Sequence, residues 1–143
     1  MLIINKSNLK EIFEPRPIKH DISLHDYGFT NFHYDPEEFI VNLAFNKTTI
    51  KAKDVKYVKI DNTTIWGSIS HGISDWFCTT IEDWKKYEEK YDLILGLNKN
   101  KIELPKGIVL NLTDDSFVAF FQFLSGFDLY IVCDEIEFNR IKK

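Results

Sequence analysis

The chain has 143 residues, 44% hydrophobic and 28% charged, which is typical of one soluble globular domain spanning residues 1–143. Eighteen Lys and Arg against 22 Asp and Glu give a net charge of −4, which argues against free nucleic acid as a ligand because phosphate binding needs clustered basic residues. No apolar run approaches the ~20 residues of a transmembrane helix, and the first residues lack a signal-peptide pattern, so we expect a cytoplasmic protein outside the membrane.

The first half of the chain predicts one short helix followed by strands. Residues 1–4 have the composition of an edge strand, and a helix is expected from a cap at Asn5 or Ser7 to Phe13, before two prolines. Four later segments are rich in β-branched and aromatic residues, namely 38–45, 48–52, 55–60 and 63–69. Turn signals separate them, so residues 38–69 are predicted to form an antiparallel meander.

The second half predicts two helices and two strands. Thr80 is the expected cap of the first helix, and Asp83 three residues later resembles a capping box. A strand is expected at 108–112. A second helix is expected over 114–124, because four apolar residues follow the i, i+3, i+4, i+7 spacing of a helix face, namely Phe117, Phe120, Phe121 and Leu124. The alternating pattern of a strand is also possible for these residues.

The end of the chain completes the predicted fold. Residues 127–133 (FDLYIVC) are expected to form a final strand, and residues 134–143 a polar tail or a short helix. Helices and strands in this order predict an α+β fold, with a mixed or mostly antiparallel sheet and two to three helices packed on it.

Residues with catalytic or metal-binding potential occur without a recognisable motif. Six donors between His20 and Asp35 have the chemistry of a zinc or iron site but lack ligand spacing: His20, His25, His33, Asp21, Asp26 and Asp35. Cys78 with His71 as base is a possible nucleophile, but acidic and apolar neighbours raise rather than lower a thiol pKa. We therefore expect no catalytic residue, no metal and no cofactor.

Charge is segregated along the chain. From Gly107 to Asn139 there are six acidic residues and no Lys or Arg, within the most apolar part of the sequence. Such a segment is a plausible landing site for a basic macromolecule, and it is also typical of a buried helix and strand with acidic ends. The segment from Lys47 to Lys59 holds five lysines, which either protect a sheet edge from aggregation or neutralise the acidic C-terminal third inside the same molecule.

Aromatic side chains lie among small residues at 65–77 (IWGSISHGISDWF), where they are expected to anchor an interface or to cover one end of the core. A small, acidic α+β protein with these two stretches resembles the immunity proteins of bacterial toxin systems, including contact-dependent inhibition pairs. The resemblance implies that the chain binds one cognate toxin domain, often a basic nuclease, and blocks its active site. The implied partner-binding residues are Trp66, Asp75, Trp76, Asp114, Asp115, Asp128, Asp134, Glu135 and Glu137.

Two other functions stay open from the sequence. One is a small enzyme or ligand-binding module that uses the His20–Asp35 segment, and the other is a structural or phage-type interaction protein.

Overall fold

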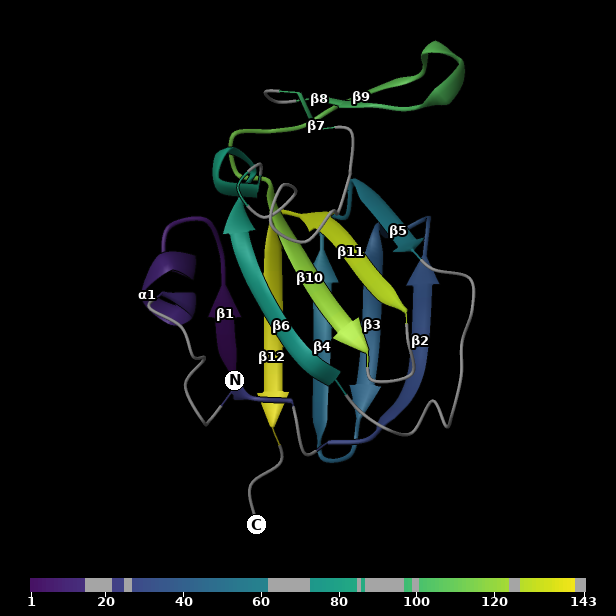
Figure 1. The fold of residues 1–143 in the computed structure, drawn as a ribbon. Helices are drawn as coiled ribbons and strands as arrows, with labels where there is room; N and C mark the ends of the chain where they lie inside the picture. Colours follow the sequence, from purple (N-terminus) through teal and green to yellow (C-terminus); the bar gives the residue numbers. More distant parts are fainter. Residues whose placement is uncertain are drawn as a thin grey trace.

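A computed structural model describes residues 1–14, 22–24, 27–61, 73–84, 86, 97–98, 101–123 and 127–140. These segments form mostly antiparallel sheet, and Figure 1 shows a four-stranded sheet lying across a five-stranded one. In spatial order the five-stranded sheet contains β1 (Leu2–Ile4), β12 (Glu135–Arg140), β4 (Thr48–Lys53), β3 (Ile40–Phe45) and β2 (Phe29–Asp35). The four-stranded sheet contains β5 (Tyr57–Asp61), β11 (Asp128–Cys133), β10 (Phe117–Phe123) and β6 (Ile73–Thr80).

The remaining described elements are short. A small antiparallel sheet contains β7 (Leu97–Asn98), β8 (Lys101–Glu103) and β9 (Val109–Asn111). Helical segments are α1 (Leu9–Phe13), the single turn η2 (Pro105–Gly107) and residues 81–84. The expected sheet is therefore confirmed as mostly antiparallel, whereas these short helices give only rough support to two or three helices packed on it. Within the described segments, no helix has the length and hydrophobicity needed to cross a bilayer.

The β3–β4 hairpin forms where alternation predicted it. Every second residue of β3 and β4 is buried, so one face of the pair supplies the core, whereas the other face is more exposed and includes Asn42, Lys51 and Lys53. Lys47 has φ 60°, the left-handed conformation that allows a tight turn between the strands. The predicted N-terminal edge strand is also confirmed as β1, which pairs with β12 and lies at the edge of the five-stranded sheet among the described residues.

The predicted meander over residues 38–69 is wrong beyond this hairpin. β5 leaves the five-stranded sheet and pairs with β11, and the Lys56 backbone N–H donates to the Val132 carbonyl at 2.7 Å. The chain changes sheets just after Asp54, which has φ 52°. Strand composition predicts that a segment is extended but not which strand it pairs with. The strand predicted at 63–69 lies outside the described residues.

The predicted helix over 114–124 is also wrong, because β10 is a central strand. Phe121 faces the five-stranded sheet and stacks on Trp76 at 5.4 Å, whereas Phe120 lies on the opposite face, 5.4 Å from Phe77 and 6.1 Å from Trp84. Both faces of β10 are therefore buried, and a strand buried on both faces loses its period-two pattern. Burial of Phe117, Phe120 and Phe121 is confirmed, and Leu124 lies outside the described residues.

The C-terminal segment forms a strand instead of the predicted tail or helix. β12 lies between β1 and β4 in the five-stranded sheet. Its alternate residues Ile136 and Phe138 enter the core, and Phe138 stacks against Trp76 at 5.9 Å. The outward-facing Glu135 and Glu137 gave the segment its polar character, and they lie opposite Lys53 and Lys51 of β4.

The start of the helix after β6 agrees with the capping prediction. The Thr80 hydroxyl accepts a hydrogen bond from the Asp83 backbone N–H at 3.1 Å, as an N-cap residue does. This turn places Trp84 over the outer face of the four-stranded sheet, 5.7 Å from the ring of Tyr130. The helix predicted from Asn5 or Ser7 begins later, at Leu9, because the Asn5 and Asn8 side chains form local hydrogen bonds in the preceding turn.

Candidate functional site

Several chain segments meet at one end of the five-stranded sheet. The strand register places Ile4 opposite Ile136, Glu135 opposite Lys53, and Val41 opposite Ala52. The segments that continue from these strand ends, residues 5–7, 36–39, 54–56 and 134, are therefore neighbours. Turn 113–116 joins them, because the Lys6 ammonium donates to the Asp114 carbonyl at 2.7 Å. Loops gathered at one end of packed sheets are common places for binding residues.

Acidic side chains dominate a pocket at this end. The pocket has a volume of about 400 Å³ and is lined by Asn5, Lys6, Ser7, Asp54, Asp115, Asp134 and Glu135. Four carboxylates and one ammonium group therefore line the pocket. We call Asp54, Asp114, Asp115, Asp134 and Glu135 the acidic rim. Neighbouring carboxylates at a concave surface produce a negative potential that attracts basic groups.

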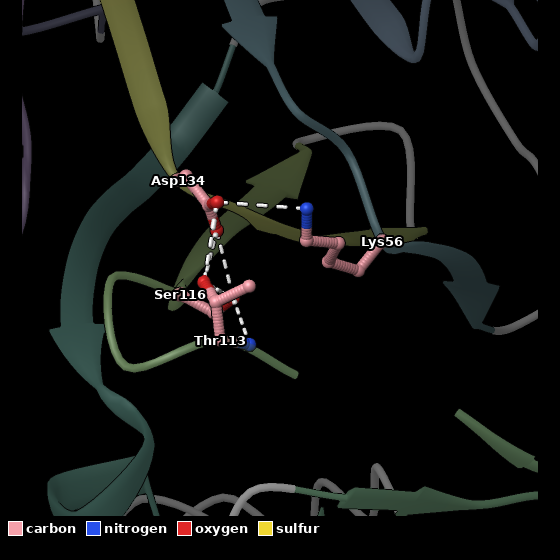
Figure 2. Close-up of polar contacts among 4 residues, drawn as sticks. All are labelled: Lys56, Thr113, Ser116 and Asp134. Atoms are coloured by element: carbon pink, nitrogen blue, oxygen red, sulfur yellow. Dashed lines mark hydrogen bonds and ion pairs between the residues drawn. The ribbon is translucent and has the colours of Figure 1, made fainter. Parts of the chain in front are cut away.

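Asp134 holds the acidic rim together (Figure 2). Its carboxylate accepts a hydrogen bond from the Ser116 hydroxyl at 2.7 Å and from the Thr113 hydroxyl at 3.2 Å, and it pairs with the Lys56 ammonium at 3.5 Å. Ser116 is only 1% exposed, so its hydroxyl cannot meet a substrate from solvent. These contacts therefore tie turn 113–116 and residue 56 to the bend between β11 and β12.

Lysines of β4 and the following turn neutralise several acids predicted to bind a partner. The Lys53 ammonium lies 3.7 Å from a Glu135 oxygen and also pairs closely with Glu137. The hydrogen bond that the Lys53 ammonium donates to Glu137, together with the charges of Glu137 and Glu135, raises the pKa of Lys53 against the opposing effect of desolvation. The hypothesis that the Lys47–Lys59 segment neutralises the C-terminal acids internally is thus confirmed for Lys53 and Lys56.

The predicted partner-binding acids do not form one surface. Asp114 and Asp115 are exposed on the acidic rim, and Asp134 and Glu135 lie beside them in internal ion pairs. Asp75 and Asp128 both lie opposite Gln122, near the other end of β10. Glu137 projects from the middle of β12 and pairs with Lys53. Two predicted acids therefore lie at the opposite end of the molecule from the acidic rim.

Trp76 is not the surface anchor that the sequence suggested. Its side chain is 1% exposed, and its indole N–H donates to the Ile22 carbonyl at 2.8 Å. Phe13 packs edge-on against it at 5.0 Å, and Phe77 beside it is also buried. The reason is that β6 is covered on both faces, so its adjacent aromatics enter two separate packed layers. Trp66, the other predicted anchor, lies outside the described residues.

The histidines and aspartates that were considered as metal ligands, and the base considered for Cys78, lie mostly outside the described residues. His33 is exposed on β2, whereas His20, His25, Asp21, Asp26 and His71 lie outside the described residues. No three His, Cys, Asp or Glu side chains in the described part of the chain are grouped to hold a metal ion.

Both cysteines are buried free thiols. Burial raises the pKa of Cys78 well above its ordinary value, with a further contribution from the charge of Cys133. Burial, and then the Asp134 charge, likewise raise the pKa of Cys133. A nucleophilic cysteine needs the opposite shift, so the structure argues against the Cys78 nucleophile.

Exposed aromatics at the turn between β2 and β3 were missed from the sequence. Tyr34 is 42% exposed and Phe39 is 55% exposed, on either side of Glu37 and Glu38. Glu38 and Phe39 were expected inside a strand, but β3 begins at Ile40. The detectable signal was the Asp-Pro pair, which is typical of a turn.

Phe39 has φ 56°, a conformation that costs a bulky L-residue about 1–2 kcal/mol. Such strain is often found at functional positions.

Comparisons of the chain with protein-family models, curated protein sequences and solved structures found no match.

Proposed function

We propose that this chain is a cytoplasmic binding protein that neutralises a cognate bacterial toxin domain by covering a basic surface of that domain with the acidic rim. The observation that carries the proposal is the pocket of about 400 Å³, which is lined by four carboxylates and one ammonium. A basic active site, such as the phosphate-binding site of a nuclease, offers complementary charges of this kind.

The acids of the rim have different roles in this proposal. Asp134 and Glu135 lie in ion pairs with Lys56 and Lys53, so much of their charge is balanced within the chain. Asp54 and Asp115 are exposed, and they line the same pocket. We expect Asp54 and Asp115 to interact most with a partner, and we expect Asp134 to maintain the shape of the rim.

Electrostatic attraction also explains how a small inhibitor would act quickly. Complementary charge at an interface raises association rates by about 10- to 1,000-fold, and this gain falls as salt concentration rises. A toxin that enters or is made in the cell must be bound before it acts. The acidic rim therefore supports a function in which the association rate matters.

Growth rescue tests the proposal. The protein domain encoded directly upstream of this chain's gene would be expressed under an inducible promoter, alone and with this chain. We expect the domain alone to stop growth and the wild-type chain to restore it. A double charge reversal, Asp54→Lys with Asp115→Lys, should lose rescue while remaining folded.

The matched control reverses two exposed acids of α1 and its C-terminal cap, Glu11→Lys with Glu14→Lys. This control changes net charge equally and should keep full rescue. A harmless upstream domain would refute the toxin-neutralising function. Equal loss of rescue in both double variants would show that total charge matters rather than the acidic rim.

A further inference from the structure

The turn between β2 and β3 presents an apolar side chain in a fixed position. Phe39 is 55% exposed although Phe is usually buried, and its backbone is in the left-handed region at φ 56°. Nearby Tyr34 is 42% exposed. An exposed aromatic on a strained backbone is an observation that points to function, since a flexible polar turn would avoid both costs.

Hydrogen bonds fix this turn on both sides of Phe39. The Asp35 carboxylate accepts from the backbone N–H of Glu37 at 3.0 Å and of Glu38 at 3.2 Å. The Phe39 carbonyl accepts from the Val55 backbone N–H at 2.9 Å. A side chain on a rigid turn loses little freedom when it binds, which is the property expected of an interface anchor.

The hydrogen bond between the Phe39 carbonyl and the Val55 N–H also connects the turn to the acidic rim. Val55 directly follows Asp54, which lines the acidic pocket, so the Phe39 carbonyl is bonded to the neighbouring segment of the rim. Glu37 and Glu38 are exposed and extend the negative charge around the aromatic side chain. An apolar anchor surrounded by acids complements an apolar pocket surrounded by basic residues.

We propose that Phe39, supported by Tyr34 and flanked by Glu37 and Glu38, is the hydrophobic anchor of this chain and inserts into an apolar pocket within a basic protein surface. This inference rests on the proposed function, because it assigns the anchor of the same partner interface. It goes beyond that function by locating the binding determinant in a turn outside the acidic pocket. Ile60 on β5 is equally exposed but lies on a regular strand, and among the described residues no other exposed large apolar side chain stands on a backbone with positive φ.

Site-specific photocrosslinking in the native host tests the contact. The photoreactive analogue p-benzoylphenylalanine would replace Phe39, Asp115 or Ile60 in the full chain, one position at a time. We expect the analogue at positions 39 and 115 to crosslink to the same basic protein, identified by mass spectrometry. Position 60 has similar exposure, 54%, and should give no such adduct.

The crosslinking outcomes separate the two proposals. An adduct at position 115 but not at 39 would overturn the anchor and leave the proposed function standing. No adduct at either position would overturn both. Crosslinking of position 39 to a second copy of this chain, or to an acidic protein, would also overturn the anchor, because a basic partner is required.

A glycine substitution then distinguishes an anchor from a structural residue. Phe39→Gly relieves the backbone, because glycine adopts positive φ without strain, so the melting temperature should stay equal or rise. Its dissociation constant for the crosslinked protein should increase about thirtyfold or more, as for an interface hot spot.

Lys47→Gly is the matched control, because it relieves the same kind of backbone strain, at φ 60° in the β3–β4 turn. This variant should not affect binding. Unchanged binding of Phe39→Gly, or equal weakening by Lys47→Gly, would overturn the anchor.

Discussion

Replacing Asp134 with alanine should destabilise the fold strongly, although Asp134 is one of several acids on the same rim. Its hydrogen bond from the Ser116 hydroxyl, at 2.7 Å, joins a buried donor to a charged acceptor, a type of bond worth about 1.5–3 kcal/mol. The Thr113 bond at 3.2 Å is longer, and the partly exposed Lys56 pair adds about 0–1 kcal/mol. We expect Asp134→Ala to cost about 3 kcal/mol in total.

The assay is equilibrium unfolding in urea, followed by fluorescence of the buried Trp76 and Trp84. The midpoint should fall at unchanged slope, which indicates lost stability without a change of cooperativity. Asp115→Ala is the control, because Asp115 is exposed on the same rim, and surface changes usually stay within about 0.5 kcal/mol. Loss of less than about 0.5 kcal/mol in Asp134→Ala, or an equal loss in both variants, would refute the structural role of Asp134.

Three further predictions concern the core and charge. Phe120→Ala should cost about 3–5 kcal/mol, measured by thermal and urea unfolding, and an unchanged melting temperature would show that the outer face of β10 is not packed. Cys78 and Cys133 should not react with Ellman's reagent at pH 8 until the protein unfolds, because burial raises the pKa of both thiols; rapid native reaction would contradict this. Desolvation raises the pKa of the Asp83 carboxyl, but neighbouring lysines lower it, so that the pKa lies below 3.8 overall. The contribution of Asp83 to the free energy of unfolding is therefore present above that pH and is lost as the pH falls further. In urea unfolding from pH 5 to 2, the free energy of unfolding should therefore decrease less with falling pH in Asp83→Asn than in the wild type. Identical pH profiles would disprove this contribution.

Local sequence patterns predicted the elements whose structure depends on local contacts. The β3–β4 hairpin alternates cleanly and has a turn signal, and the cap at Thr80 depends on residues three positions apart. In β10 the alternation of buried and exposed residues that identifies a strand is missing, because both faces of the strand are buried. β12 does alternate, with Ile136 and Phe138 buried, but Glu135 and Glu137 made the segment resemble a polar tail because their partner Lys53 is supplied by β4.

The candidate site was only partly predictable from the sequence, because the contacts that define it join residues from different strands. The sequence identified the acids of the rim and raised the possibility that lysines neutralise them, but only the strand register shows which acids are paired. Trp76 looked like an interface anchor because small and polar residues precede it, whereas cross-strand packing buries it against Phe121. Phe39 was missed because its exposure depends on a turn conformation that propensities do not predict.

The most direct test of the account is the association rate with the upstream-encoded domain at two salt concentrations, measured by stopped-flow fluorescence. We predict that Asp54→Lys with Asp115→Lys slows association about tenfold or more at low salt and flattens its salt dependence, whereas the Glu11→Lys with Glu14→Lys control changes both much less. Association that is insensitive to salt, or equally slowed in the two double variants, would contradict the claim that the acidic rim binds a basic partner.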